Sequence, residues 1–295
     1  MSATPFTALA CPLDGAPLQR SGASWRCAAG HCFDLAAQGY VNLLPVQNKR
    51  SRDPGDSKEM VAARRRFLEA GHYRPIADAV AAAVLDGAPA DRTLACLDAG
   101  CGEGYYLRQL AAAAGAAHRL ALLGLDISKW AVQAAAKRDL QDARGTAGAT
   151  ANPCAAWVVG SNAGLPVLPA TLDRVLCMFG FPVYPEFARV LRPGGELLQV
   201  DAGPDHLREL REVIYPVLKP ERPAERLAPG GFVHLGTETL RSRIHVDGNA
   251  QIADLLAMTP HLYRASAEGR ARAAALNTLT MTVDVRLARY RRMDA

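Results

Sequence analysis

The sequence lacks any long apolar run, which argues against a membrane-spanning helix. Its longest uninterrupted run, residues 79–85, is far shorter than the ~20 residues that a span needs. The N-terminus also lacks a basic start and a long apolar stretch, so we expect no signal peptide and a cytoplasmic protein. Hydrophobic residues make up 49% and charged residues 21% of the chain, and this balance argues against disorder.

The sequence also lacks the even number of cysteines that a fully disulfide-paired protein would have. The chain has seven, several of them in apolar strand-like runs, which predicts reduced thiols rather than a secreted disulfide scaffold. Cys11 and Asp14 are separated by two residues, and Cys27 and His31 by three. Cys-x2-Cys followed by Cys-x3-His is typical of structural zinc, and zinc accepts an oxygen ligand where Asp14 replaces cysteine. The spacing predicts zinc on these four residues, with Cys32 as an alternative ligand. The other interpretation is that packing has replaced the metal.

The chain divides by composition into three segments. Residues 1–45 are rich in Cys, Gly and Pro and form a small N-terminal module. Residues 46–92 begin with a polar linker and continue into helices, with a break at residues 71–73 before a restart at Pro75. In residues 93–295 short apolar runs alternate with helical segments, which predicts an α/β domain with a parallel, doubly wound sheet.

A glycine-rich loop follows the first apolar run of that domain. It reads Asp98-Ala-Gly100-Cys-Gly102-Glu-Gly104, and Asp126 ends the next apolar run. Glycines let a ligand approach the backbone, and the later carboxylate accepts both hydroxyls of a ribose. A nicotinamide enzyme would place its third glycine differently, and a purely structural turn is the other alternative. The pattern resembles class I S-adenosylmethionine (AdoMet) methyltransferases, which implies cofactor contacts at this loop and Asp126, and an adenine-edge contact at Asn162.

Longer segments carry a closer resemblance. CPLDGAPL, FDLAAQGYVNLLPVQNKRSRDPGDSKEM, RRRFLEAGHY, LDAGCGEGYY and TPHLYRA together resemble the RlmA family of 23S rRNA (guanine-N1)-methyltransferases. The resemblance implies a zinc-ribbon-like module, a Rossmann-like domain with a seven-stranded sheet ending in an antiparallel hairpin, and a homodimer. It also implies AdoMet contacts at Tyr73, Tyr106, Leu107 and His206. The sequence departs from the family at Asp14 and at MFGFPVYPEF. At the second segment we expect the substrate side of the cofactor pocket to differ from that of the family.

The charge distribution points to RNA. The chain carries a net charge of +5, and residues 49–74 hold eight Lys/Arg against four Asp/Glu, or 8 − 4 = +4. Basic patches attract polyanions, although a solvated arginine-rich surface would look the same. The residues predicted to bind RNA are Lys49, Arg50, Arg52, Arg64, Arg65 and Arg66.

The sequence therefore predicts transfer of a methyl group from AdoMet to N1 of a guanine in a 23S rRNA hairpin. Asp53 and Asp56 are the predicted catalytic base and O6 partner, although Asp-Pro-Gly-Asp is also a turn former. Two alternatives remain: a small-molecule AdoMet methyltransferase and a non-catalytic AdoMet- or RNA-binding protein. The sequence also leaves open which of two neighbouring guanines is modified, because macrolide-resistance relatives modify the adjacent one.

Overall fold

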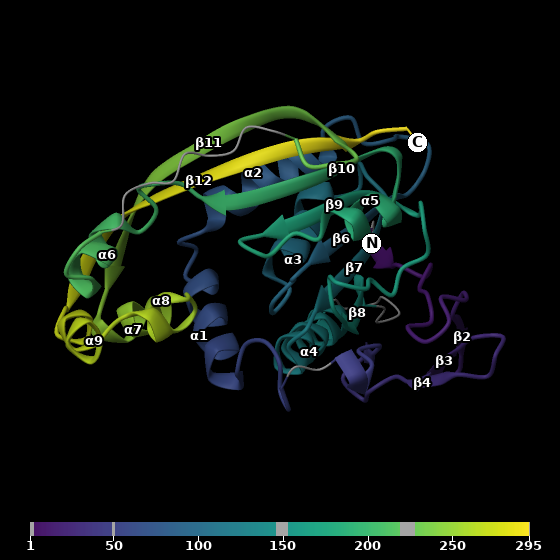
Figure 1. The fold of residues 1–295 in the computed structure, drawn as a ribbon, viewed down its shortest axis with the longest axis horizontal. Coiled ribbons are helices and arrows are strands. Elements are labelled where there is room, and N and C mark those ends of the chain that lie inside the picture. Colours follow the sequence, from purple (N-terminus) through teal and green to yellow (C-terminus); the bar gives the residue numbers. More distant parts are fainter. Residues whose placement is uncertain (1–2, 49–50, 146–152, 219–227, 295) are drawn as a thin grey trace.

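A nine-stranded sheet forms the centre of the computed structural model, which describes residues 3–48, 51–145, 153–218 and 228–294 (Figure 1). Seven strands come from the predicted α/β domain: β6 (Leu94–Ala99), β7 (Leu120–Asp126), β8 (Ala155–Val159), β9 (Leu172–Met178), β10 (Leu191–Ala202), β11 (Phe232–Asp247) and β12 (Thr278–Arg292). Their order is β8-β7-β6-β9-β10-β12-β11. The first five are parallel, and β12 runs antiparallel to both β10 and β11. The predicted seven strands and terminal antiparallel hairpin are confirmed.

The N-terminal module supplies the other two strands of this sheet. β1 (Ala3–Pro5) pairs in parallel with β7, and β5 (Tyr40–Asn42) pairs in parallel with β8. The module also forms a small antiparallel sheet of β2 (Gln19–Ser21), β3 (Ser24–Arg26) and β4 (Cys32–Asp34). Backbone hydrogen bonds therefore cross the predicted segment boundary at residue 45.

Alternate residues of the central strands bury their side chains in two apolar clusters, one on each face of the sheet. Helices α2 (Arg74–Leu85), α3 (Tyr105–Ala114) and α4 (Lys129–Gly145) pack on one face. The other face is covered by α5 (Tyr184–Val190) and by the module, through Phe6, Leu9 and Trp25 among others. The fully described connection from β8 to β9 contains no helix. The module thus fills a place on the sheet that a crossover helix would otherwise occupy.

The predicted helical break lies between α1 (Lys58–Glu69) and α2. Ser57 caps α1, since its Oγ accepts the N–H of Met60 at 3.3 Å. A 3-10 turn, η1 (Val46–Asn48), precedes this region. Pro75 occupies the first turn of α2, as predicted.

The C-terminal part extends the sheet to one side. β11 and β12 pair along their whole length and run from the main sheet to a group of helices (Figure 1). These are α6 (Arg208–Ile214), α7 (Asn249–Ala257), α8 (His261–Arg264) and α9 (Ala267–Ala274). The terminal hairpin agrees with what the family resemblance implied. No helix in the described ranges is long and apolar enough to cross a membrane.

A candidate cofactor cavity and a candidate metal centre

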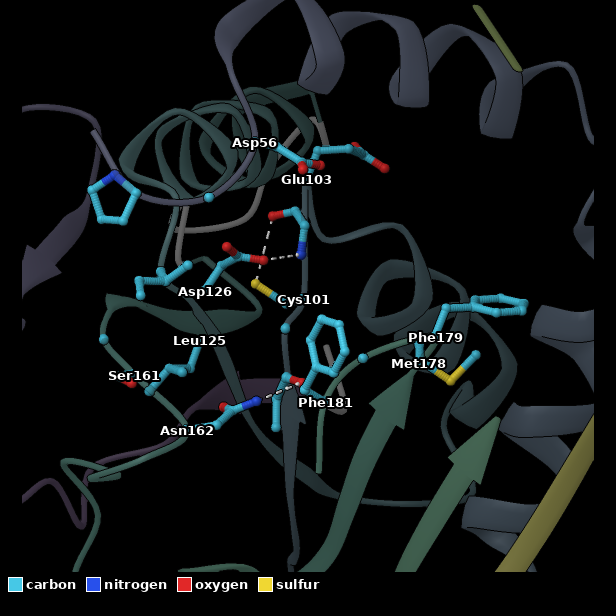
Figure 2. A pocket seen from close by; sticks show the side chains of 18 of the residues that line it. Asp56, Cys101, Glu103, Leu125, Asp126, Ser161, Asn162, Met178, Phe179 and Phe181 are labelled. Atoms are coloured by element: carbon cyan, nitrogen blue, oxygen red, sulfur yellow. Dashed lines mark hydrogen bonds between the residues drawn. The ribbon is translucent and has the colours of Figure 1, made fainter. Parts of the chain in front are cut away.

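A cavity of about 950 Å³ opens at the carboxyl ends of four neighbouring strands (Figure 2). Each strand contributes residues to the lining: Gly100 and Gly102 follow β6, Asp126 and Ile127 end or follow β7, Ser161 and Asn162 follow β8, and Phe179 and Phe181 follow β9. Open α/β sheets bind ligands at this edge, because the strand ends and helix N-termini converge there.

The glycine loop is fixed against β7 by its backbone. The N–H groups of Gly100 and Cys101 both donate to the carbonyl of Leu125, at 2.8 and 3.0 Å. Gly104 has a φ of +82°, and a Cβ there would lie 2.5 Å from the Trp157 ring. Only glycine fits that position, so the sequence holds the loop and the first turn of α3 tightly beside the cavity.

Asp126 connects the glycine loop to the start of α4. Its Oδ2 accepts the N–H of Gly102 at 2.9 Å, and its Oδ1 accepts the N–H of Ser128 at 2.8 Å. Burial raises the pKa of the Asp126 carboxyl, while the two N–H donors act in the opposite direction. Each carboxylate oxygen keeps a second lone pair, so the side chain can still accept two hydroxyl groups from a ligand.

Several buried acceptors at this edge have no hydrogen-bond partner among the described residues. They are both carboxylate oxygens of Asp98, Oε1 of Glu103 and Oδ1 of Asn162. Burial and the nearby charge of Asp126 raise the pKa of Asp98 to about 8. The Asn162 amide donates to the carbonyl of Ala99 at 3.3 Å, which leaves its oxygen available (Figure 2). Folded proteins seldom leave such atoms unpaired. The amine, hydroxyl and adenine amino groups of AdoMet are donors of the kind that the free oxygens of Glu103 and Asn162, which line the cavity, can accept.

The linker before α1 folds over one side of the cavity. A Cβ on Gly55 would lie 2.8 Å from Cβ of Ser128, and the Ser128 hydroxyl donates to the carbonyl of Asp56 at 2.7 Å. The Asp56 carboxylate in turn forms an ion pair with Arg64 at 2.6 Å. Asp56 and Arg64 therefore line the cavity near Asp126, whereas Asp53 is exposed and outside the lining.

An aromatic cluster closes the opposite side. The Tyr73 hydroxyl lies 3.1 Å from His206 Nε2, and Phe179 packs against both rings. The backbone N–H of Asp284 donates to His206 Nδ1, and burial lowers the pKa of His206 to about 4. The neutral ring therefore carries its proton on Nε2 and donates it to Tyr73. The hydroxyl proton of Tyr73 is left available for the cavity.

Most, but not all, of the predicted cofactor contacts line this cavity. Those that do are Tyr73, Gly100, Gly102, Tyr106, Asp126 and Asn162. Asp98, Gly104, Leu107 and His206 lie behind the lining, with Asp98 and Leu107 fully buried. Of the predicted RNA contacts Arg64 lines the cavity, while Arg52, Arg65 and Arg66 do not. Lys49 and Arg50 lie outside the described residues. The roles of these side chains remain predictions.

Among the residues that sequence reasoning missed at this site, four bear directly on its geometry. Glu103 lies within the glycine loop and pairs with Arg108 at 2.7 Å, and Ser128 holds the linker in place. Phe179 and Phe181 lie in MFGFPVYPEF, the segment that departs from the family's pattern. That departure was the only signal for the two phenylalanines, and it did not indicate which of the residues would face the cavity.

The candidate metal centre lies in the N-terminal module. The ligand atoms of Cys11, Asp14, Cys27 and His31 all lie within 4.8 Å of one another. His31 Nδ1 is 3.4 Å from Sγ of Cys11, 3.3 Å from Sγ of Cys27 and 3.1 Å from Oδ2 of Asp14. Tetrahedral zinc with bonds of ~2.0–2.3 Å separates its ligand atoms by roughly 3.3–3.8 Å, so the four residues fit the ion. Cys32 is exposed and outside this group.

Two family models match separate parts of the chain. A zinc-ribbon model described as "RlmA, N-terminal" matches residues 9–52 and so includes all four ligands. A model described as "Methyltransferase domain" matches residues 96–195, from β6 to the start of β10. The first match contains the metal centre, and the second contains the glycine loop, Asp126 and the other strand-end residues of the cavity.

Individual relatives match over most of the chain. A Micromonospora griseorubida protein described as "Putative 23S rRNA (guanine-N(1)-)-methyltransferase" is 37% identical, covering 96% of this chain and 97% of the relative. The Streptomyces fradiae 23S rRNA (guanine(748)-N(1))-methyltransferase is 36% identical, covering 85% and 84%. Bacillus subtilis YxjB, with the same description as the first, is 33% identical, covering 71% and 70%.

Proposed function

Because the chain belongs to the RlmA family of 23S rRNA (guanine-N1)-methyltransferases, we propose that it transfers a methyl group from AdoMet to N1 of a guanine in 23S rRNA. The observation that carries this proposal is the 37% identity over almost the whole chain. It covers both the zinc ribbon and the methyltransferase domain, whereas a small-molecule methyltransferase would need only the second.

AdoMet fits the cavity by the chemistry of its lining. We place the ribose hydroxyls on Asp126, the adenine edge on the free Oδ1 of Asn162, and the methionine part along Gly100 and Gly102. Tyr73, Tyr106 and Leu107 stay proposed contacts at the methionine end, and His206 acts there through its hydrogen bond to Tyr73. When bound, AdoMet supplies a methyl group on a positively charged sulfur. Transfer of that methyl group leaves the sulfur as a neutral thioether.

The protein's task in this reaction is to position guanine and to manage one proton. Neutral guanine carries a proton on N1, and negative charge builds up at O6 as that proton leaves. Asp56 is the proposed base, because among the two predicted carboxylates only this one lines the cavity. Arg64, 2.6 Å from Asp56, keeps the carboxylate oriented and adds positive charge where O6 becomes negative. Asp53 remains a proposed partner from the same linker.

The RNA surface is proposed to begin at this linker and to continue along α1. Arg65 is exposed on α1, while Arg66 forms an ion pair with Asp254 at 2.5 Å. Arg52 lies exposed in the linker itself. We therefore assign Arg65 and Arg52 the larger share of phosphate contacts, since both are exposed, whereas Arg66 would have to leave Asp254.

Zinc stabilises the N-terminal module from within. Cys11 and Cys27 are buried beside Leu9 and Trp25 in the cluster under the central sheet, so the metal joins two parts of the module at the point where it packs on the main domain. We also propose that the protein forms a homodimer and that it acts in the cytoplasm, where its rRNA substrate is found.

Tritium transfer from labelled AdoMet tests this function. Purified protein is incubated with total RNA from cells that lack the enzyme, and in parallel with an RNA-free metabolite extract. We expect label in 23S rRNA as N1-methylguanine. Label in metabolites alone would favour the small-molecule alternative, and no label with AdoMet bound would favour a non-catalytic protein.

A further inference from the structure

A large aromatic side chain stands exposed at the edge of the cofactor cavity. Phe181 is 88% exposed, yet it lines the cavity just beyond the end of β9. In Figure 2 the Phe181 ring lies among the labelled cavity residues, whereas the Phe179 ring points away from Cys101 and Asp126. Leaving so much apolar surface in water beside a ligand site is unfavourable unless a ligand covers it.

The backbone holds Phe181 in this position. Phe179 has a φ of +52°, rare for a residue with a bulky side chain, and its N–H donates to the carbonyl of Val200 at 2.8 Å. The ring contacts of Phe179 with Tyr73 and His206 stabilise this reversed backbone. Pro182 follows and restricts Phe181 to an extended backbone. The exposed ring is therefore presented by a constrained turn and not by a freely moving loop.

The order of the strands indicates what this ring contacts. Asp126 and Asn162 follow β7 and β8, which lie on one side of β6, whereas Phe181 follows β9 on the other side. The strand that leads to Phe181 therefore lies across β6 and its glycine loop from the strands that lead to Asp126 and Asn162. The space beside Phe181 faces the end of the cofactor that carries the methyl group, where the substrate base has to enter.

We propose that Phe181 is the stacking platform for the guanine that receives the methyl group. This inference rests on the proposed function, in which N1 lies on the pairing edge and the guanine must leave its stack to react. An aromatic face holds an extruded base without using its hydrogen-bonding edge, so N1 and O6 remain free for the groups that accept the proton and stabilise the developing charge. Phe181 thereby determines how the guanine is positioned and takes no part in the proton transfer.

The test replaces Phe181 by Leu, Tyr and Trp. Leu keeps an apolar side chain but removes the aromatic face, while Tyr and Trp keep it. With a 23S rRNA hairpin that the wild type methylates, Phe181→Leu should lower kcat/KM roughly ten- to hundredfold, since stacking contributes that much per base. Phe181→Tyr and Phe181→Trp should retain most activity. AdoMet affinity measured by calorimetry without RNA should stay the same in all three variants.

A second RNA separates stacking from a general surface effect. Phe181→Leu should weaken binding of the guanine hairpin but not of a hairpin that is abasic at the modified position, because no base is then present to stack. Equal weakening of both RNAs, unchanged kcat/KM in the Leu variant, or a loss of AdoMet affinity would overturn the inference, the last by placing the ring on adenine. If the wild type methylates no RNA, the proposed function fails instead, so the two failures are distinguishable.

Discussion

Replacement of Asp126 by alanine tests how the cavity holds its cofactor. The carboxylate accepts N–H groups from Gly102 and Ser128 and, in the account above, both ribose hydroxyls. A hydrogen bond to a charged group contributes about 1.5–3 kcal/mol, so losing even one hydroxyl contact should raise the Kd for AdoMet roughly 10- to 150-fold. The measurement is calorimetric titration of the purified protein with AdoMet.

A stability effect accompanies the binding effect and has to be separated from it. Asp126→Ala also leaves two backbone N–H groups without their acceptor, which costs about 1–3 kcal/mol each where they stay shielded from water. Thermal unfolding without AdoMet measures that part. Asp78→Ala is the matched control, because Asp78 is exposed on α2, pairs with Arg74 on the same helix and lies outside the cavity. A folded Asp126→Ala protein with the Kd of the control would refute the assignment of the ribose to Asp126.

Three further predictions concern the metal, the RNA surface and pH. Zinc should copurify with the protein near one equivalent. A chelator should remove it more slowly from Asp14→Cys than from the wild type, because thiolate binds zinc more tightly than an exposed carboxylate. Elemental analysis showing less than a tenth of an equivalent of zinc in a folded wild type would contradict this. Arg65→Ala should reduce the slope of log K for RNA binding against log salt concentration by about 0.9. Arg66→Ala should reduce it by less, since Arg66 is paired with Asp254. Equal slopes for the wild type and Arg65→Ala would rule out a phosphate contact of Arg65. Burial lowers the pKa values of His206 and His261 to about 4. As pH falls, the unfolded chain protonates both imidazoles near pH 6.5, before the folded protein does. The free energy of unfolding should therefore fall as pH drops from about 6.5 towards 4. Urea unfolding at several pH values checks this, and a His206→Gln protein with an unchanged slope would exclude His206 as a cause.

Features encoded by neighbouring residues were predictable from the sequence. The glycine loop, the acid at the end of β7 and the Cys-x2-Asp and Cys-x3-His spacings each depend on a few adjacent positions, so local pattern indicates their geometry. The helical break at residues 71–73 was equally visible, because Gly71 and Pro75 act on the backbone directly.

Features that depend on distant contacts were not predictable. β1 and β5 are three residues long, and nothing in such short segments indicates that they would pair with β7 and β8. The hydrogen bond between Tyr73 and His206 joins residues 133 positions apart. The direction of the Phe181 ring follows from a positive φ two residues earlier, which no residue-type preference predicts for phenylalanine.

Primer extension on 23S rRNA tests the central claim most directly. A methyl group on N1 blocks the pairing edge of guanine, so reverse transcriptase stops one nucleotide before it. The account predicts a new stop at a single hairpin guanine when rRNA from a strain lacking the enzyme is treated with the protein and AdoMet. Treated 23S rRNA without any new stop, from protein shown to bind AdoMet, would contradict it.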